Sequence, residues 1–253
     1  MKRPLIIAHR GASAEAPENT LAAFRRAIEI GADGVEFDVR LAADGVPVVI
    51  HDATLERTAG LKHRIAEMTT DELAQIDVGS WFNRRFPHFA DEAYSSETVP
   101  TLAKTLEFLS NLVGPIYLEV KIDSAAEVAP LTNAVGRVIA GSRLLPNIIV
   151  QSFDLRVLTR IRTHLPDIQT AALFGPRLVH FVSGRQRLVD LALQHGAKHL
   201  SLHHSLVNKR IAVRAAAAGL PITVWTVNDP HWLPRSTELE VYAVITNNPQ
   251  GMQ

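Results

Sequence analysis

Two short charged motifs lie within apolar, β-branched runs: EFD, from Glu36 to Asp38, and EVK, from Glu119 to Lys121. Because side chains alternate between the two faces of a strand, both charges of each motif point to one face. Three carboxylates that converge repel one another, so an ionised cluster needs a compensating cation. Oxygen ligands suit a hard divalent ion, which predicts Mg²⁺ or Ca²⁺ at Glu36, Asp38 and Glu119. The alternative is a solvated face or an internal salt bridge in which Lys121 neutralises Glu119.

Two histidines and an arginine also follow apolar runs directly. His9 and Arg10 stand in the sequence AHRG, and His51 stands in VIHD. Histidine titrates near neutrality, so a pair can share the general acid and general base roles of a hydrolysis. The planar Arg10 guanidinium matches a phosphate group, and Lys121 offers a second positive charge. A divalent ion, two cations and two histidines are what phosphoryl transfer needs, because positioning and charge stabilise its transition state.

The elements that must position these residues are short strands that alternate with helical patterns. The apolar runs lie at residues 5–8, 35–39, 46–50, 116–120, 148–150, 170–174, 199–202, 222–227 and 241–246. About eight strand and helix units predict an α/β fold, a closed TIM (β/α)₈ barrel, with functional groups at the carboxyl ends of its strands. Nine runs exceed eight, and the Asp-Gly turn at 44–45 indicates that two of them form a hairpin. We therefore expect a distorted barrel in which one unit lacks its helix.

Length and composition narrow the remaining classes. We expect one domain over residues 1–253, with a polar insertion after the third strand at about 53–98. Lys plus Arg and Asp plus Glu both number 26, which argues against nucleic-acid or anionic-membrane partners. The motifs of nucleotide loops, serine-hydrolase elbows and HExxH zinc sites are absent. The cysteine-free sequence and short apolar start predict a cytoplasmic location without stable membrane association. The sequence does not indicate the oligomeric state.

Five sequence blocks together resemble a known family. They are AHRGASAEAPENTLAAF, GVEFDVRLAADGVPVVIHDATLERT, YLEVK, VQSFD and VWTVND. These blocks are similar, in order and over nearly the whole chain, to the signature blocks of the glycerophosphodiester phosphodiesterase family. The resemblance implies a TIM-barrel hydrolase with a small-molecule substrate. Such an enzyme uses one divalent cation to split a glycerophosphodiester, such as glycerophosphocholine or glycerophosphoethanolamine, into sn-glycerol 3-phosphate and an alcohol.

The resemblance also implies a role for each candidate residue. The acid/base pair is His9 and His51, the metal ligands are Glu36, Asp38 and Glu119, and the substrate contacts are Arg10, Lys121, Phe153 and Trp225. Trp225 is expected to pack against the glycerol or alcohol part, with Phe153 as a second candidate. The insertion is expected to cap the barrel mouth and to shape alcohol selectivity.

One position departs from the family pattern, and two other functions stay open. The last strand ends in Thr-Asn-Asn-Pro at 246–249, where many relatives have Thr-Asp-x-Pro, so Asn247 lacks the charge found there. A lysophospholipase D-type enzyme would need an apolar rim that faces a membrane, and the chain offers only Trp81 and Phe82 as an aromatic pair. A non-catalytic barrel that binds phosphodiesters would have no need of paired histidines beside three carboxylates.

Overall fold

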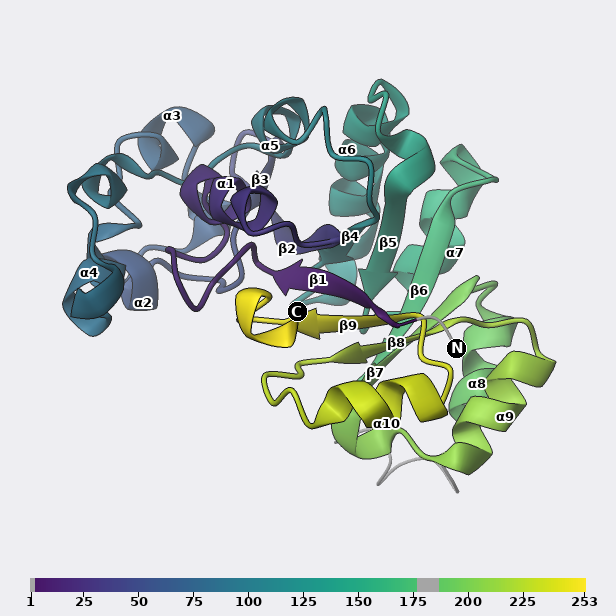
Figure 1. The fold of residues 1–253 in the computed structure, drawn as a ribbon. Helices are drawn as coiled ribbons and strands as arrows, with labels where there is room; N and C mark the ends of the chain where they lie inside the picture. The colour runs from purple at the N-terminus through teal and green to yellow at the C-terminus, as the bar shows by residue number, and fades with distance from the viewer. Residues whose placement is uncertain (1–2, 177–186) are drawn as a thin grey trace.

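Eight strands pair side by side in parallel and close into a barrel (Figure 1). The computed structural model describes residues 3–176 and 187–253. The strand order is β1-β9-β8-β7-β6-β5-β4-β2, and pairing of β1 with β2 closes the ring. The strands are β1 (Leu5–His9), β2 (Gly34–Leu41), β3 (Pro47–Val49), β4 (Ile116–Val120), β5 (Ile148–Ser152), β6 (Gln169–Phe174), β7 (His199–His203), β8 (Ile222–Trp225) and β9 (Ala243–Thr246). The predicted TIM barrel is confirmed.

The distortion of the barrel comes from the β2–β3 hairpin. Strand β3 pairs antiparallel with β2 and stands outside the ring, and a turn with a left-handed glycine, Gly45 at φ 77°, joins the two strands. An antiparallel pair needs only a short loop, whereas a parallel pair needs a long crossover. The unit that begins at β2 therefore has no helix directly after its strand, as the Asp-Gly turn predicted.

Helices follow the other strands and cover the outside of the ring. They are α1 (Leu21–Glu29), α5 (Leu102–Phe108), α6 (Val128–Ala140), α7 (Arg156–His164), α8 (Arg187–Gln194), α9 (Lys209–Ala217) and α10 (Trp232–Glu238). Short side chains at their starts cap several of them: the Thr20 hydroxyl accepts a hydrogen bond from the amide of Ala23, and Asn208 does the same for Ile211. The apolar faces of α1, α5, α6 and α7 pack on one half of the barrel, and those of α8, α9 and α10 on the other.

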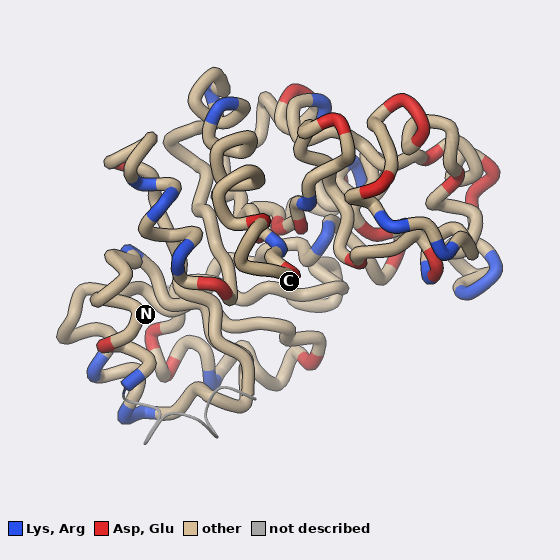
Figure 2. Tube along the Cα trace, turned by 180° about the vertical axis from the view of Figure 1, so that it is seen from behind, with Lys and Arg blue, Asp and Glu red and all other residues tan. Residues whose placement is uncertain are grey.

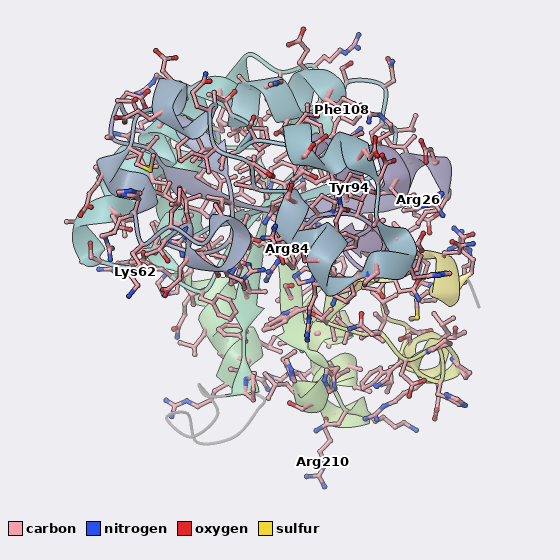
Figure 3. All side chains as sticks on the ribbon, turned by 90° about the vertical axis from the view of Figure 1, so that its left-hand side faces the viewer. Arg26, Lys62, Arg84, Tyr94, Phe108 and Arg210 are labelled. Carbon is pink, nitrogen blue, oxygen red and sulfur yellow. The ribbon has the colours of Figure 1, made fainter. Side chains whose placement is uncertain are left out.

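The segment between β3 and α5 forms a lobe of short helices beside the barrel (Figure 1). Its helices are α2 (Glu56–Ala59), α3 (Thr70–Leu73) and α4 (Ser80–Arg85), with 3₁₀ turns at η1 (Ile65–Glu67), η2 (Pro87–Phe89) and η3 (Glu92–Ser96). Leu55, Ile65, Leu73 and Val78 form a small core of its own, against β3 residues such as Val48. Figure 3 shows this lobe facing the viewer, with Lys62 projecting outward from it.

Apolar side chains fill the lower part of the barrel interior. Ile7, Tyr117, Ile149, Ala171, Ala243 and Ile245 form this inner cluster. The Tyr117 hydroxyl and the Thr223 hydroxyl hydrogen-bond at 2.7 Å, which satisfies two polar groups in an otherwise apolar layer. The described carboxylates that point into the barrel lie above this layer, toward the carboxyl ends of β2 and β4.

Acidic and basic residues are interspersed along the chain (Figure 2). This mixture agrees with the balanced composition, in which each sign contributes 26 residues. Among the residues that the structure describes, no helix has both the length and the apolar character that crossing a bilayer requires.

Candidate active site

The end of β1 turns sharply and places His9 and Arg10 at the barrel mouth. Arg10 adopts a left-handed backbone with φ 56°, and Gly11 follows with φ 79°. A Cβ atom on Gly11 would lie 2.6 Å from Ala23, so only glycine allows this turn to pack against α1. The backbone amide of Arg10 donates a hydrogen bond to Glu36 Oε2 at 3.2 Å, which ties the turn to the neighbouring strand.

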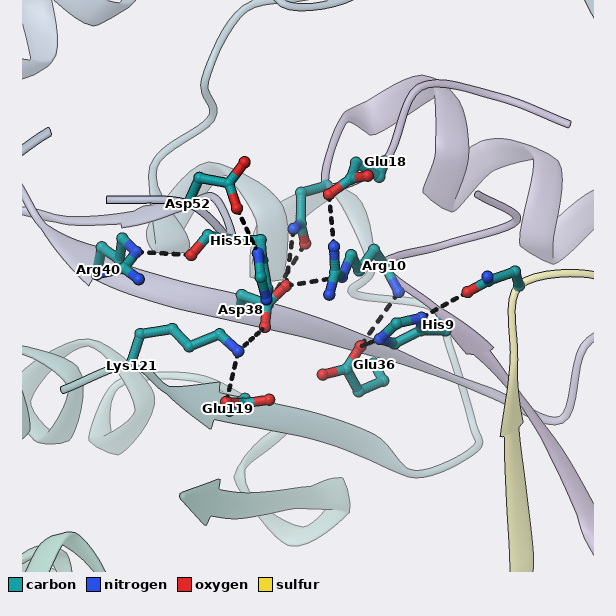
Figure 4. A network of polar contacts seen from close by, with 12 residues as sticks. His9, Arg10, Glu18, Glu36, Asp38, Arg40, His51, Asp52, Glu119 and Lys121 are labelled. Carbon is teal, nitrogen blue, oxygen red and sulfur yellow. Dashed lines mark hydrogen bonds and ion pairs between the residues drawn. The ribbon is translucent and has the colours of Figure 1, made fainter. Parts of the chain in front are cut away.

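The carboxylates of Glu36, Asp38 and Glu119 converge as the alternation of strand side chains predicted. Glu36 and Asp38 point into the barrel from β2, and β4 pairs in a register that places Glu119 opposite Asp38. All three side chains are buried, and one oxygen of each lies within 4.8 Å of the others (Figure 4). Such a group of oxygen donors fits a hard divalent cation.

Two cations contact this carboxylate group: Lys121, directly after β4, and Arg10, directly after β1. Lys121 Nζ lies 3.0 Å from Asp38 Oδ1 and 2.6 Å from Glu119 Oε1, and Arg10 Nε lies 3.2 Å from Asp38 Oδ2. The ion pair between Lys121 and Glu119 that the sequence left as an alternative is thus present, and Lys121 is shared with Asp38. Ion pairing and carboxylate convergence occur together in this site.

The electrostatics of the three carboxylates differ although they are neighbours. Burial raises the pKa of Glu36 well above its ordinary value, and the charges of Asp38 and Glu119 raise it further. Burial also raises the pKa of Glu119. Burial acts in the same direction on Asp38, but Lys121 and Arg10 outweigh it and hold the pKa of Asp38 far below its usual range. Three carboxyl groups thus face Lys121 and Arg10, the raised pKa values of Glu36 and Glu119 reflect burial and mutual repulsion, and a further cation would relieve that repulsion.

Each of the two histidines hydrogen-bonds an oxygen acceptor through Nδ1. His9 Nδ1 lies 2.5 Å from Asn247 Oδ1, and His51 Nδ1 lies 2.7 Å from Asp52 Oδ1. Because these oxygens only accept, Nδ1 donates in both rings; Nε2 of His9 lies 3.8 Å from Glu36 Oε2. Asn247, the position that departs from the family pattern, therefore still orients His9. Burial, aided by the Arg10 charge, lowers the pKa of His9 to about 4.

The sequence did not reveal that Asn19 supports Asp38. Asn19 is buried in the loop before α1 with φ 57°; its Nδ2 donates to Asp38 Oδ2 at 3.0 Å, and its Oδ1 accepts from the Asp38 amide at 3.3 Å. Glu18 also contacts the site, through Arg10 Nη1 at 2.8 Å. Both residues belong to the polar stretch APENT at 16–20. An Asn just before a helix is most often a helix cap, so the sequence did not indicate a role in the site; in the structure Thr20 is the cap.

Aromatic side chains line the other side of the barrel mouth. Phe153 follows β5 and meets the Trp225 ring edge to face at a centroid distance of 5.6 Å, and Trp225 meets His203 at 5.2 Å. Gly175 lies beneath the two larger rings, where a Cβ atom would touch Phe153 at 3.4 Å. The charged groups thus come from β1, β2 and β4, and the aromatic groups from β5, β7 and β8.

A cavity of about 190 Å³ joins the two sides. The residues that line it are His9, Arg10, Glu36, His51, Glu119, Lys121, Gln151, Phe153, Leu173, Trp225, Thr226 and Ile245. Eight of the nine residues predicted from the sequence are in this set, and the ninth, Asp38, is fully buried behind Arg10 and Lys121. Gln151 is a further polar wall residue, and its Nε2 donates to Glu36 Oε1 at 3.4 Å.

A TIM barrel whose mouth combines carboxylates, two cations and two histidines in one cavity belongs to the class of barrel enzymes that act on phosphate esters. Residues 9–251 match the model of the Glycerophosphoryl diester phosphodiesterase family. The chain therefore belongs to this family and is a phosphoric diester hydrolase, which confirms the resemblance of the five sequence blocks.

Individual relatives span the same length. YhdW of Bacillus subtilis (strain 168) is 31% identical over 244 residues, which are 96% of this chain and 94% of YhdW. The glycerophosphodiester phosphodiesterase of Caldanaerobacter subterraneus subsp. tengcongensis is 29% identical over 251 residues, 99% of this chain and 96% of that protein. Among solved structures, an Oleispira antarctica phosphodiesterase in complex with the product sn-glycerol-3-phosphate has a TM-score of 0.86 at 29% identity, with coverage of 99% of this chain and 96% of that chain.

Proposed function

We propose that this protein hydrolyses small glycerophosphodiesters, such as glycerophosphocholine or glycerophosphoethanolamine, to sn-glycerol 3-phosphate and an alcohol. The observation that carries the proposal is the single cavity that brings together both histidines, both cations and two of the three carboxylates. The likeness to a phosphodiesterase that was solved with sn-glycerol-3-phosphate supports the choice of the glycerol phosphate half. A cavity of about 190 Å³ suits a small polar substrate.

Glu36, Asp38 and Glu119 would hold one divalent cation, Mg²⁺ or Ca²⁺. One oxygen of each lies within 4.8 Å of the others, and Asp38 Oδ1 and Glu119 Oε1 both face Lys121 Nζ, at 3.0 and 2.6 Å. Oxygen donors of this kind match a hard ion. When bound, the ion would supply a Lewis acid that neutralises charge on the phosphate oxygens.

The remaining groups would bind the phosphate and move protons. Arg10 and Lys121 would hold phosphate oxygens, because both cations line the cavity beside the carboxylates. His9 and His51 would act through Nε2: one would take the proton of the attacking hydroxyl, and the other would give a proton to the leaving alcohol oxygen. The hydrogen bonds to Asn247 and Asp52 would fix both rings through Nδ1 and leave Nε2 to exchange protons; the ring that acts as the acid would carry a proton on both nitrogens.

Trp225 and Phe153 would contact the substituent of the phosphate. Their rings form the uncharged side of the cavity, where an alkyl or glycerol group loses less hydration than an ion would. We further propose that residues 1–253 work as one domain, with the insertion at about 53–98 shaping the choice of alcohol. A cytoplasmic location and the absence of stable membrane association remain proposals that rest on the cysteine-free, charge-balanced sequence.

The test is release of glycerol 3-phosphate from glycerophosphocholine by protein stripped with EDTA and then titrated with Mg²⁺ or Ca²⁺. We expect no release without metal and restored release with one of the ions, and Glu119→Gln should need more metal. His9→Ala and His51→Ala should each lower kcat by about 10²-fold or more, because each removes a proton-transfer group. Folded protein that releases nothing with either ion, or that acts only on lysophospholipid, would refute the proposed substrate class.

A further inference from the structure

Arg57, in helix α2 of the insertion lobe, reaches back to the barrel and bonds two acidic side chains. Its Nη1 and Nη2 donate to Glu18 Oε2 and Oε1 at 2.7 and 2.8 Å, and its Nε donates to Asp52 Oδ2 at 2.6 Å. One guanidinium thus bridges the loop after β1 and the loop after β3. Its plane also lies over Trp81 of the lobe, 5.7 Å from the ring centroid.

Each of these two carboxylates also bonds a residue of the active site. Glu18 Oε1 accepts from Arg10 Nη1 at 2.8 Å, and Asp52 Oδ1 lies 2.7 Å from His51 Nδ1 (Figure 4). A continuous chain of charged contacts therefore runs from Arg10 through Glu18, Arg57 and Asp52 to His51. Its two ends are the proposed phosphate ligand and one of the proposed acid/base groups.

Arg57 itself does not line the cavity, so it has to act through its partners. Three donors of its guanidinium are already engaged, which leaves it poorly placed to take a phosphate oxygen. A second hydrogen bond joins the lobe to the loop after β1: the Tyr94 hydroxyl of the lobe donates to the Glu15 carbonyl oxygen at 3.2 Å. The lobe thus meets the loop after β1 at two points, and at one of them the contact continues to the site.

The charges agree with this geometry. Burial opposes ionisation of Glu18, but hydrogen bonds and charges from Arg57 and Arg10 outweigh it and lower the pKa of Glu18. The hydrogen bond to His51 and the contacts with Arg57 lower the pKa of Asp52. Without Arg57, two carboxylates would face the site with one partner each, and neither would be held in a fixed orientation.

We propose that Arg57 is a positioning residue that holds Glu18 and Asp52 as one unit and so fixes Arg10 and His51 relative to each other. This inference rests on the proposed function of the site. The planar fork of arginine matters, because a lysine offers a single point charge and cannot bond both carboxylates in this geometry. A displacement of about 1 Å in a reacting group can reduce the rate about 10²-fold.

The experiment compares Arg57→Ala, Arg57→Lys and Arg64→Ala with the wild-type protein. Arg64 is the matched control: it lies in the same lobe, its side chain is half exposed, and that side chain forms a long ion pair of 3.9 Å with Glu67. We expect Arg57→Ala to lower kcat about 10- to 100-fold and to raise KM for glycerophosphocholine, since His51 and Arg10 are both loosened. Arg57→Lys should recover little, and added guanidinium chloride should rescue Arg57→Ala more than equal ammonium chloride does.

A second readout does not depend on turnover. In ¹H–¹⁵N spectra of the imidazole rings, the Nδ1–H signal of His51 should broaden or move in Arg57→Ala and stay in place in Arg64→Ala. An Arg57→Ala protein with an unchanged His51 signal, or with kinetics within twofold of the control, would overturn the inference. If the His51 signal changes in Arg57→Ala as expected, but the wild-type protein hydrolyses no diester, the positioning role of Arg57 stands and the proposed function alone is refuted.

Discussion

Replacing Asn19 should weaken metal binding although Asn19 is not itself a proposed ligand. Its amide makes two hydrogen bonds to Asp38, at 3.0 Å to the carboxylate and at 3.3 Å to the backbone. Hydrogen bonds that orient a ligand carboxylate are worth about 10- to 100-fold in metal affinity. That range corresponds to about 1.4–2.8 kcal/mol, which agrees with about 1.5–3 kcal/mol for a hydrogen bond to a charged group.

Glycine is the appropriate replacement because Asn19 has φ 57°. Asn19→Gly removes both the amide and the Cβ atom, so the left-handed backbone is unstrained, whereas Asn19→Ala keeps the Cβ atom without the side-chain hydrogen bonds that offset its strain of about 1–2 kcal/mol. Asn19→Gly should therefore bind Mg²⁺ or Ca²⁺ about 10- to 100-fold more weakly in calorimetric titrations of EDTA-stripped protein. Asn19→Ala should show the same loss of affinity and a lower free energy of unfolding.

Asn83 provides the control. Its amide makes the same kind of paired contact, donating to the Asp91 carbonyl oxygen at 2.7 Å and accepting from the Asp91 amide at 3.1 Å, but in the insertion lobe. Asn83→Ala should leave metal affinity unchanged. If folded Asn19→Gly binds metal as tightly as Asn83→Ala does, then Asp38 does not depend on Asn19 for its orientation, or Asp38 is not a ligand.

Three further changes test the fold around the site. Burial lowers the pKa of His199 to about 4, so below about pH 6.5 the unfolded chain binds a proton at this residue that the folded state does not. The resulting decrease in the free energy of unfolding is absent above pH 6.5, grows as the pH falls toward 4, and amounts to about 2 kcal/mol at pH 5. Urea unfolding at pH 7.5 and 5 should show a smaller pH dependence in His199→Phe than in the wild-type protein, and an equal dependence would contradict the role of His199. Tyr117→Phe leaves the buried Thr223 hydroxyl without its partner at 2.7 Å, and should lower the free energy of unfolding by about 1–2 kcal/mol with kcat unchanged. Gly11→Ala forces a Cβ atom to 2.6 Å from Ala23 at φ 79°, so thermal unfolding should shift downward and KM should rise, whereas wild-type values for both would show that the turn adapts.

Much of the barrel could be predicted because its strands are buried on both faces and read as apolar runs. The run at 116–120 matches β4 residue for residue, whereas the runs at 222–227 and 241–246 extend beyond β8 and β9. The extra residues lie after β8 and before β9 and still bond the neighbouring strand: the amide of the buried Val227 donates to the Ile245 carbonyl oxygen at 2.9 Å, and the amide of Tyr242 donates to that of Ile222 at 2.8 Å. An apolar run indicates which residues are buried, whereas regular pairing with the neighbouring strands defines where a strand begins and ends.

The site was predictable where its residues follow a strand and unpredictable where they depend on a distant loop. Glu36 and Asp38 are spaced by the strand repeat itself, so their common face could be read directly. Arg57 and Glu18 are 39 positions apart and meet only because the insertion lobe folds back over the loop after β1. No local periodicity encodes that contact.

The separation of the barrel mouth into a charged and an aromatic side has a consequence for how such enzymes can diversify. The residues of the charged side lie between His9 and Lys121 in the sequence, apart from Asn247 near the C-terminus, and those of the aromatic side lie between Phe153 and Trp225. With the proposed roles, the groups that break the bond thus lie in the first stretch and the aromatic contacts to the alcohol in the second, while the insertion at about 53–98 acts on selectivity from within the first. A chimaera that takes the stretch from β5 to β8 from a relative should inherit the part of the donor's alcohol preference that the aromatic side sets, while it retains the recipient's bond-breaking machinery.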